Sequence, residues 1–369
     1  MPDHSIATSF QKHYKLFSYS DISYGTAISR DLSYSAAIAS KTDDSSMRHN
    51  KVILQKFGGS LPFSVFNLGT DSSEVTSIAY SPDNKLVAFS GLHYLDNFGV
   101  PPFASVLLYH TDSAKIFRKI FAHRRGTGTI AFAPNGKTLL TIGQDSEDGM
   151  VELRLWEIET GREIKQHNLR TIFNDKSSFP YSSIGASTFS PNGRMIYLAI
   201  ENSILVIDPS KGKVVQTCNN IFLRLKEKSQ RRSIDRRAII SNLEVSASGN
   251  RLLVFGEDIH IFELDPLSNM VLRGAPGLTQ ESGSVVSEPD RRFLCPTISP
   301  DGKTVAIGQS DGTIHLWDPT FARETITLTV STTAIPRRIR FSQDGSMLQC
   351  LDSEGVLHRW VTATTPVKP

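Results

Sequence analysis

The turn sequence Ser299-Pro300-Asp301-Gly302 recurs, with variation, along the whole 369-residue chain. Proline presets the turn backbone, and asparagine or glycine tolerates a positive φ, so each copy is suited to closing a hairpin between two strands. A repeat at this spacing predicts one architecture built from similar units. The seven copies begin at residues 29, 81, 133, 190, 246, 299 and 342, and the first, Ser29-Arg30-Asp31-Leu32, is degenerate.

Short runs of β-branched and aromatic residues flank each turn. Thr129–Phe132 precedes the third turn and Thr138–Ile142 follows it, while Thr313–Asp318 and Lys213–Thr217 exemplify a third and a fourth run. Four short strands per unit are typical of a β-propeller blade. We therefore expect an all-β fold: a single closed β-propeller of seven four-stranded blades over residues 1–361, with a disordered tail at 362–369. If the degenerate first unit is not a blade, the count becomes six.

Two units resemble WD40 repeats. Gln309–Asp318, which ends in Leu-Trp-Asp, looks like the end of such a repeat, and so does Val151–Glu157. His123 lies seven residues before Ile130, which matches the spacing from the Gly-His pair of the family to its first strand, with Ala122 in the glycine position. The resemblance covers roughly residues 12–361 and is strongest at 122–161 and 299–318; the other five units diverge. It implies a structural hydrogen-bond set made by His123, Thr141, Trp156 and either Asp145 or Asp148.

The two ends of the repeat array complement each other. The last unit stops after its third strand, Val356–Trp360, and an unassigned strand-like run, His13–Tyr19, precedes the first turn. An open sheet edge invites pairing with other chains. We therefore predict that the N-terminal segment supplies the fourth strand of the last blade and closes the ring.

The sequence contains no motif for enzyme chemistry or metal binding. It has no His-Glu-x-x-His, Cys-x-x-Cys or Gly-x-Ser-x-Gly pattern. Gly-Lys-Thr occurs twice, but each copy lies in a hairpin turn without the helix that a phosphate-binding loop needs. We expect no catalytic residue, no metal and no cofactor. No apolar run reaches the ~20 residues of a membrane span, and three scattered cysteines suit a reducing, cytoplasmic location.

Surplus length gathers in the connectors that share one face of the predicted disc. The longest lie at residues 41–50, 92–105, 170–183, 219–238 and 274–292. In repeat proteins, loops elaborated on one face commonly form the binding face. Disordered decoration is an equal alternative for 274–292, and the order of 219–238 is also left open.

Arginine pairs and aromatic residues mark the same connectors. Guanidinium groups grip carboxylate or phosphate with paired hydrogen bonds, and aromatic side chains anchor interfaces. The net charge is only +3, so the arginines predict a local basic patch at the channel mouth. The candidate partner-binding residues are Arg124, Arg125, Arg231, Arg232, Arg236, Arg237, Arg291, Arg292, Arg337, Arg338, Tyr94, Phe98 and Phe103.

These observations favour a non-catalytic, WD40-like scaffold or adaptor that binds another protein, expected to present an acidic segment, within a multi-subunit complex. The first alternative is a propeller that binds nucleic acid through the same arginines, for which steep salt dependence is the signature. The second is a propeller-fold hydrolase or lyase with acidic residues gathered at the channel.

Overall fold

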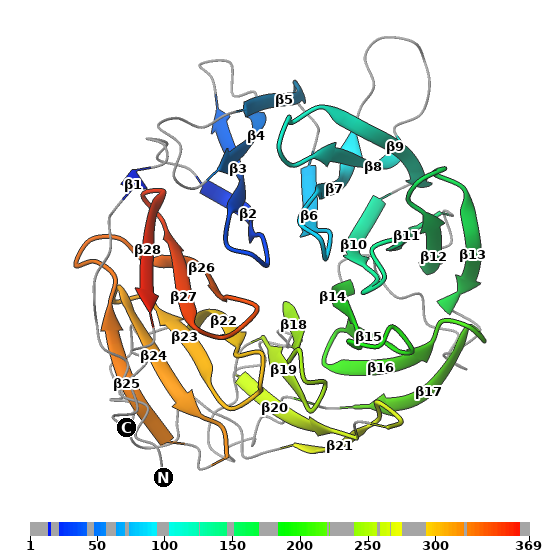
Figure 1. Cartoon of the computed structure of the whole chain (residues 1–369). Coiled ribbons are helices and arrows are strands. Elements are labelled where there is room, and N and C mark those ends of the chain that lie inside the picture. The colour runs from blue at the N-terminus through cyan, green and yellow to red at the C-terminus, as the bar shows by residue number, and fades with distance from the viewer. Residues whose placement is uncertain are drawn as a thin grey trace, which may run out of the picture.

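The described residues form a ring of seven antiparallel sheets in a computed structural model of the chain (Figure 1). The structure describes residues 14–15, 22–42, 48–56, 64–70, 74–93, 103–124, 126–145, 151–169, 184–219, 221, 240–256, 259–265, 267–274, 293–320 and 323–361. Each sheet has four strands, so the chain has seven blades, as the seven turns predict. Within the described ranges, no helix has the length and apolar character of a membrane span.

Four blades take up the first part of the chain. Blade 1 contains β2 (Ile22–Ile28), β3 (Tyr34–Thr42), β4 (Arg48–Lys56) and β5 (Ser64–Thr70). Blade 2 contains β6 (Glu74–Tyr80), β7 (Leu86–His93), β8 (Phe103–His110) and β9 (Ile116–His123). Blade 3 contains β10 (Gly126–Phe132), β11 (Thr138–Gln144), β12 (Val151–Glu157) and β13 (Glu163–Asn168). Blade 4 contains β14 (Ile184–Phe189), β15 (Ile196–Ile200), β16 (Ser203–Asp208) and β17 (Lys213–Cys218).

Three blades complete the ring. Blade 5 contains β18 (Asn242–Val245), β19 (Arg251–Phe255), β20 (Ile259–Leu264) and β21 (Val271–Gly274). Blade 6 contains β22 (Phe293–Ile298), β23 (Val305–Gln309), β24 (Thr313–Asp318) and β25 (Arg323–Thr329). Blade 7 contains β26 (Pro336–Phe341), β27 (Met347–Asp352) and β28 (Val356–Val361), with β1 (Tyr14–Lys15) as its fourth strand.

The repeated turns join the innermost strand of each blade to the next strand. In blade 6 the Ser299 hydroxyl donates to Asp301 Oδ1 at 2.7 Å and accepts from the Thr304 backbone N–H at 2.9 Å. The fourth turn residue has φ between +57° and +76° in all seven blades, a region that favours glycine. Leu32 adopts it in blade 1, so the degenerate turn has the same backbone shape as the other six.

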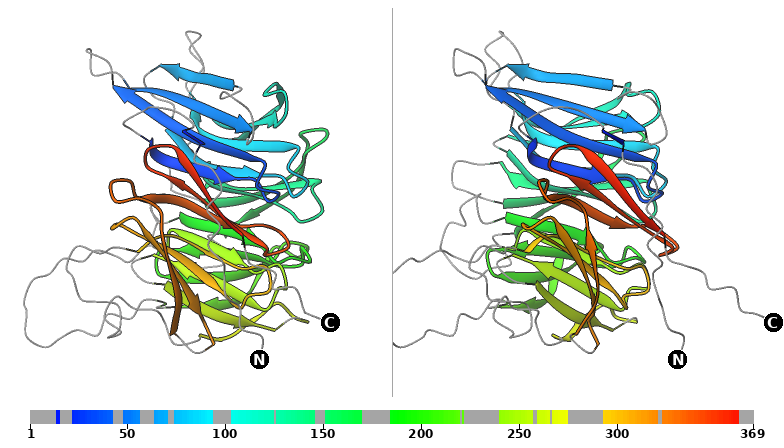
Figure 2. Two further views of the ribbon diagram at one scale, coloured as in Figure 1. Left: turned by 60° about the vertical axis from the view of Figure 1, so that its left-hand side comes forward. Right: turned by 90° about the vertical axis from the view of Figure 1, so that its left-hand side faces the viewer.

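Neighbouring blades share hydrophobic cores. Every residue of β15 is buried, and consecutive side chains point to opposite faces of the sheet. Ile196, Leu198 and Ile200 pack in a cluster with blade 3, whereas Tyr197 and Ala199 pack in a cluster with blade 5. Complete burial of one large apolar side chain contributes about 1.5–3 kcal/mol. Apolar packing between neighbouring blades therefore stabilises the ring. The side views in Figure 2 show the sheets packed around the ring.

The ring closes between blade 7 and blade 1. Strand β1 pairs antiparallel with β28, with Tyr14 opposite Leu357 and Lys15 opposite Val356. A second connection joins the first turn, in blade 1, to two strands of blade 7. The Leu32 carbonyl accepts hydrogen bonds from Gln349 Nε2 at 3.2 Å and from Arg359 Nη2 at 3.4 Å. Segments from the two ends of the chain thus meet in one sheet and across one blade interface.

Two connectors are shorter than the sequence predicts. Strand β3 continues to Thr42 and β4 begins at Arg48, so half of 41–50 is paired strand. Strands β7 and β8 likewise include Leu92–His93 and Phe103–Ser105 of the predicted 92–105 insertion. The prediction was wrong at these edges because both hairpins extend beyond the length of the other inner hairpins, and the local sequence does not mark where their pairing stops. The greater part of the other three insertions and the tail at 362–369 lie outside the described residues.

Candidate functional site: the arginine-lined channel

The seven innermost strands surround a central cavity of about 950 Å³. The residues that line it follow from the turn register. Consecutive residues of the inner strands, such as Ala79 and Tyr80, contribute to the lining. Counting back two and four positions from each turn gives cavity-lining residues in most blades: Ala27, Ala79, Ala131, Thr188, Glu244 and Arg340, and Ser77, Thr129, Ala186, Asn242, Cys295 and Arg338.

The turns themselves form the rim of one channel mouth. The second residue of every turn lines the cavity, and in six blades it is proline, alanine or glutamine. Blade 1 places Arg30 there. Prolines of one turn lie against the glycine of the next, as Pro134 does beside Gly193. Arg30 is therefore a cation set into a rim of otherwise uncharged residues: Pro82, Pro134, Pro191, Ala247, Pro300 and Gln343.

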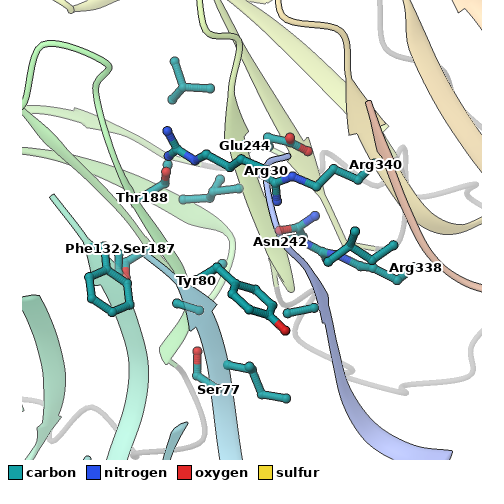
Figure 3. Close-up of a pocket in the computed structure, with 18 of the residues that line it drawn as sticks. Arg30, Ser77, Tyr80, Phe132, Ser187, Thr188, Asn242, Glu244, Arg338 and Arg340 are labelled. Atoms are coloured by element: carbon teal, nitrogen blue, oxygen red, sulfur yellow. The ribbon is translucent and has the colours of Figure 1, made fainter. Parts of the chain in front are cut away.

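Blade 7 supplies the other arginines of the cavity. In β26 the pairing register with β27 shifts between Pro336 and Arg338, which is a β-bulge. A bulge lets two consecutive side chains reach one face, and Arg337 and Arg338 both line the cavity, as does Arg340 further along the strand. Figure 3 shows the side chains of Arg30, Arg338 and Arg340 together with Asn242 and Glu244.

The charge of this cavity is unbalanced. Its described lining contains four arginines but a single carboxylate, Glu244 on β18. Glu244 Oε1 accepts a hydrogen bond from Thr297 Oγ1 at 3.2 Å, which fixes the carboxylate against blade 6. Among the described residues, no carboxylate lies within salt-bridge distance of Arg30, Arg338 or Arg340. The cavity thus has positive charge that the described part of the chain does not neutralise.

Confinement in the channel perturbs two of the arginines. Burial lowers the pKa of Arg340 to about 10; the Glu244 carboxylate opposes this shift, and repulsion from Arg338 and Arg30 adds to it. Burial also lowers the pKa of Arg30, against the attraction of Glu244. Arg30 is nevertheless exposed to solvent. The channel walls replace only part of the hydration shell that a free guanidinium group has in water. Both side chains remain charged at neutral pH.

The predicted partner-binding residues are only partly described. Arg337 and Arg338 line the cavity, whereas Arg124 is exposed just beyond β9 and does not. Phe103 begins strand β8. The remaining nine lie outside the described residues: Arg125, Arg231, Arg232, Arg236, Arg237, Arg291, Arg292, Tyr94 and Phe98. Asp148, the alternative carboxylate of the structural hydrogen-bond set, also lies outside them.

The hydrogen-bond set that the family resemblance implies is assembled between blades 2 and 3. His123 Nε2 and Thr141 Oγ1 are 2.9 Å apart, and Trp156 Nε1 donates to the same hydroxyl at 2.9 Å. The carboxylate is that of Asp145, whose Oδ2 lies 3.3 Å from His123 Nδ1. Asp145 Oδ1 also accepts from the Arg124 backbone N–H at 2.9 Å. This network is far from the channel and joins an outer strand to the next blade.

Arg154 supplies the positive charge in this network. Its guanidinium pairs with both Asp145 and Glu152, and it lies 3.4 Å from a Glu163 carboxylate oxygen. His123, Asp145 and Glu152 could approach one metal ion, but Arg154 already bridges the two carboxylates. Burial lowers the pKa of His123, and hydrogen bonds, first from His123, hold the pKa of Asp145 well below its usual range.

Sequence reasoning missed three residues of the channel: Arg30, Arg340 and Glu244. The signal for Arg30 was the second position of the first turn, where arginine replaces the proline, alanine or glutamine of the other copies. The signal for Arg340 and Glu244 was their shared place two residues before a turn, where the other inner strands carry alanine or threonine. Both departures are visible only when the units are aligned position by position.

Comparison with known proteins gives the class. The family model of the WD domain, G-beta repeat, matches residues 289–318. A curated relative, apoptotic protease-activating factor 1 of Danio rerio, is 21% identical over 315 residues; the match covers 70% of this chain and 24% of the relative. The chain therefore spans about a quarter of the length of that relative.

A solved structure has the same fold. The Cps50 (Swd1) β-propeller domain from Myceliophteria thermophila superposes with a TM-score of 0.63 at 14% identity, covering 96% of this chain and 99% of the other. The chain is a seven-bladed β-propeller whose residues 289–318 are similar to a WD domain, G-beta repeat. WD40 propellers generally serve as scaffolds that bind other proteins.

Proposed function

We propose that this propeller is a non-catalytic interaction scaffold that holds an acidic segment of a partner protein in its central channel. The observation that carries the proposal is the charge of the channel, where Arg30, Arg337, Arg338 and Arg340 face one carboxylate, Glu244. Gathered positive charge steers anionic partners and speeds their association. A rigid ring places these groups before the partner arrives, which reduces the ordering cost of binding.

The proposal extends to the face that carries the long connectors. Arg124 is exposed there, and the arginine pairs and the aromatic residues Tyr94, Phe98 and Phe103 belong to the same set of connectors. A partner that passes through the channel would meet these residues on one side and the turn rim on the other. The three cysteines are unpaired, which supports a reducing, cytoplasmic setting as part of the proposal, within a multi-subunit complex.

The two alternatives receive less support from the channel. A hydrolase or lyase of propeller fold needs acidic groups gathered at the channel, whereas Glu244 is the single carboxylate of the described lining. A nucleic acid would meet the same arginines through its phosphates, so this alternative has to be separated by experiment. Nuclease treatment and salt dependence make that separation.

The test is affinity purification of the intact protein from its native cells, with nuclease, followed by mass spectrometry. We expect a stoichiometric protein that is lost from the double variant Arg30→Ala/Arg340→Ala. The matched control is Arg194→Ala, because Arg194 is exposed in the turn of blade 4 and does not line the cavity. Equal recovery with wild type and the double variant contradicts the channel as the binding site. Loss of all bound protein upon nuclease treatment favours nucleic acid.

A further inference from the structure

The channel has a charge that a particular kind of group would neutralise. The guanidinium groups of Arg30, Arg337, Arg338 and Arg340 and the carboxylate of Glu244 line one cavity, so the described lining has a net charge of +3. A carboxylate ligand carries one negative charge, whereas a phosphate monoester carries nearly two at neutral pH. A dianion therefore neutralises most of this charge, whereas a single aspartate or glutamate of a partner leaves two of the three positive charges unpaired.

Hydrogen-bond capacity in the cavity is also unfilled. Arg338 Nε is buried and has no hydrogen-bond partner in the described part of the chain. Buried polar groups in native proteins are nearly always paired with protein, water or ligand. Guanidinium N–H groups donate in a planar fork that fits two oxygens of a phosphoryl group at once. Arg30 of blade 1 and Arg338 and Arg340 of blade 7 offer three such forks to the cavity, and repulsion from Arg338 and Arg30 on the Arg340 guanidinium shows that they lie near it.

We propose that the arginine-lined channel binds a phosphate monoester dianion through Arg30, Arg338 and Arg340, with Glu244 limiting the charge of the site. This inference identifies the acidic group in the channel as a phosphoryl group. Where that group belongs to a partner protein, the inference rests on the proposed function. The phosphoryl group has two sources, a phosphorylated side chain of the partner or a free small phosphate monoester. Their shared chemistry defines the site.

The effect of ligand charge is separated from that of ligand shape by comparing phenyl phosphate with phenyl sulfate. The affinity of each ligand for the full chain is measured by isothermal titration calorimetry at pH 7.5. The two ligands have nearly the same shape, but only the phosphate is a dianion, since its second pKa is about 6. We expect phenyl phosphate to bind at least about tenfold more tightly than phenyl sulfate. Equal affinities, or no binding of either ligand, overturn the proposal.

Binding measurements on variants test whether the ligand binds in the channel. Arg340→Ala and Arg30→Ala are each expected to weaken phenyl phosphate binding by about 10- to 100-fold, the usual effect of losing a charge-assisted hydrogen bond. Arg194→Ala should leave it unchanged. Glu244→Gln should strengthen it severalfold, because one negative charge leaves the site while the shape is kept. Thermal melting shows whether each variant is folded. Equal losses in Arg340→Ala and Arg194→Ala, or weaker binding in folded Glu244→Gln, overturn the proposal.

The two sources are distinguished with a short peptide that carries one phosphoserine and the same peptide carrying glutamate. Tighter binding of the phosphopeptide than of phenyl phosphate, with the glutamate peptide at least about tenfold weaker, supports a phosphorylated partner. Equal binding of phosphopeptide and phenyl phosphate supports a free phosphate monoester. If phosphate does not bind but a protein is still captured through Arg30 and Arg340, this inference fails while the scaffold proposal stands.

Discussion

The backbone N–H of Arg30 donates a hydrogen bond to Asn84 Oδ1 at 2.8 Å. Arg30 is the second residue of the first turn, and Asn84 is the last residue of the second turn. The bond therefore fixes the arginine of one blade against the turn of the next. Asn84 holds φ at +60°, which brings its amide oxygen into this position. The channel cation is oriented by the ring around it.

Removal of that bond should weaken binding without unfolding the protein. Asn84→Gly keeps the positive φ and deletes the acceptor oxygen. We expect affinity for phenyl phosphate to fall about threefold to tenfold, because one neutral hydrogen bond contributes roughly 0.5–1.5 kcal/mol. Calorimetry measures the affinity and thermal melting checks the fold. Unchanged affinity in the folded variant would show that Arg30 needs no support from Asn84.

Anion affinity should depend on pH on both sides of neutrality. As pH falls below about 6, a phosphate monoester gains a proton and loses one negative charge, so binding weakens. As pH rises through about 10, Arg340 loses its proton and its charge, so binding weakens again. Between these limits we expect a plateau. Calorimetric titrations from pH 5 to pH 10.5 provide the measurement; affinity that keeps rising toward pH 10.5 is incompatible with a role for Arg340.

The Thr141 hydroxyl is expected to be important for stability. It is fully buried and is bonded to both His123 and Trp156. Thr141→Val keeps the volume but leaves two buried nitrogens without this partner, which should cost about 2–4 kcal/mol in the free energy of unfolding. Thr160→Val is the control, since Thr160 is exposed and bonds only at the surface. Denaturation with urea measures both, and similar losses in the two variants would contradict the importance of the network.

Ring closure should contribute measurably to stability. Deletion of residues 1–20 removes β1 and leaves β28 with a free edge. We expect a lower melting temperature and self-association that increases with protein concentration, because unpaired edges pair with other chains. Deletion of residues 362–369 provides the comparison. A melting temperature that is equally high after the N-terminal deletion would show that the pairing of Tyr14 and Lys15 with β28 is dispensable.

The sequence was sufficient for the fold because turn chemistry is local. The Ser-Pro-Asp-Gly copies determine hairpins by themselves, and their spacing sets the blade count. Even Leu32 adopts the positive φ of its glycine counterparts, because the surrounding turn and the hydrogen bonds to its carbonyl hold it there. Strand edges were harder: Thr42 and Arg48 are polar but paired across an extended hairpin.

The candidate site was harder to predict because it is assembled from the two ends of the chain. Arg30 lies on the first turn and Arg340 on the last inner strand, and only ring closure brings them into one cavity. Arginine pairs drew attention to 337 and 338, whereas single residues at Arg30, Glu244 and Arg340 have no local pattern. They become visible through register: Arg30 occupies a position that is uncharged in the other six blades, and Arg340 and Glu244 share a position that carries alanine or threonine in the other five.

The central claim is that the channel is the place where the partner binds, and photo-crosslinking tests it most directly. A photoreactive benzoylphenylalanine replaces Gln343, which is exposed and lines the channel mouth, or Leu267, which is 84% exposed in the outer turn of blade 5. We expect the partner to be crosslinked from position 343 and not from position 267, and we expect phenyl phosphate to compete with the crosslink. Crosslinking from position 267 alone would contradict it.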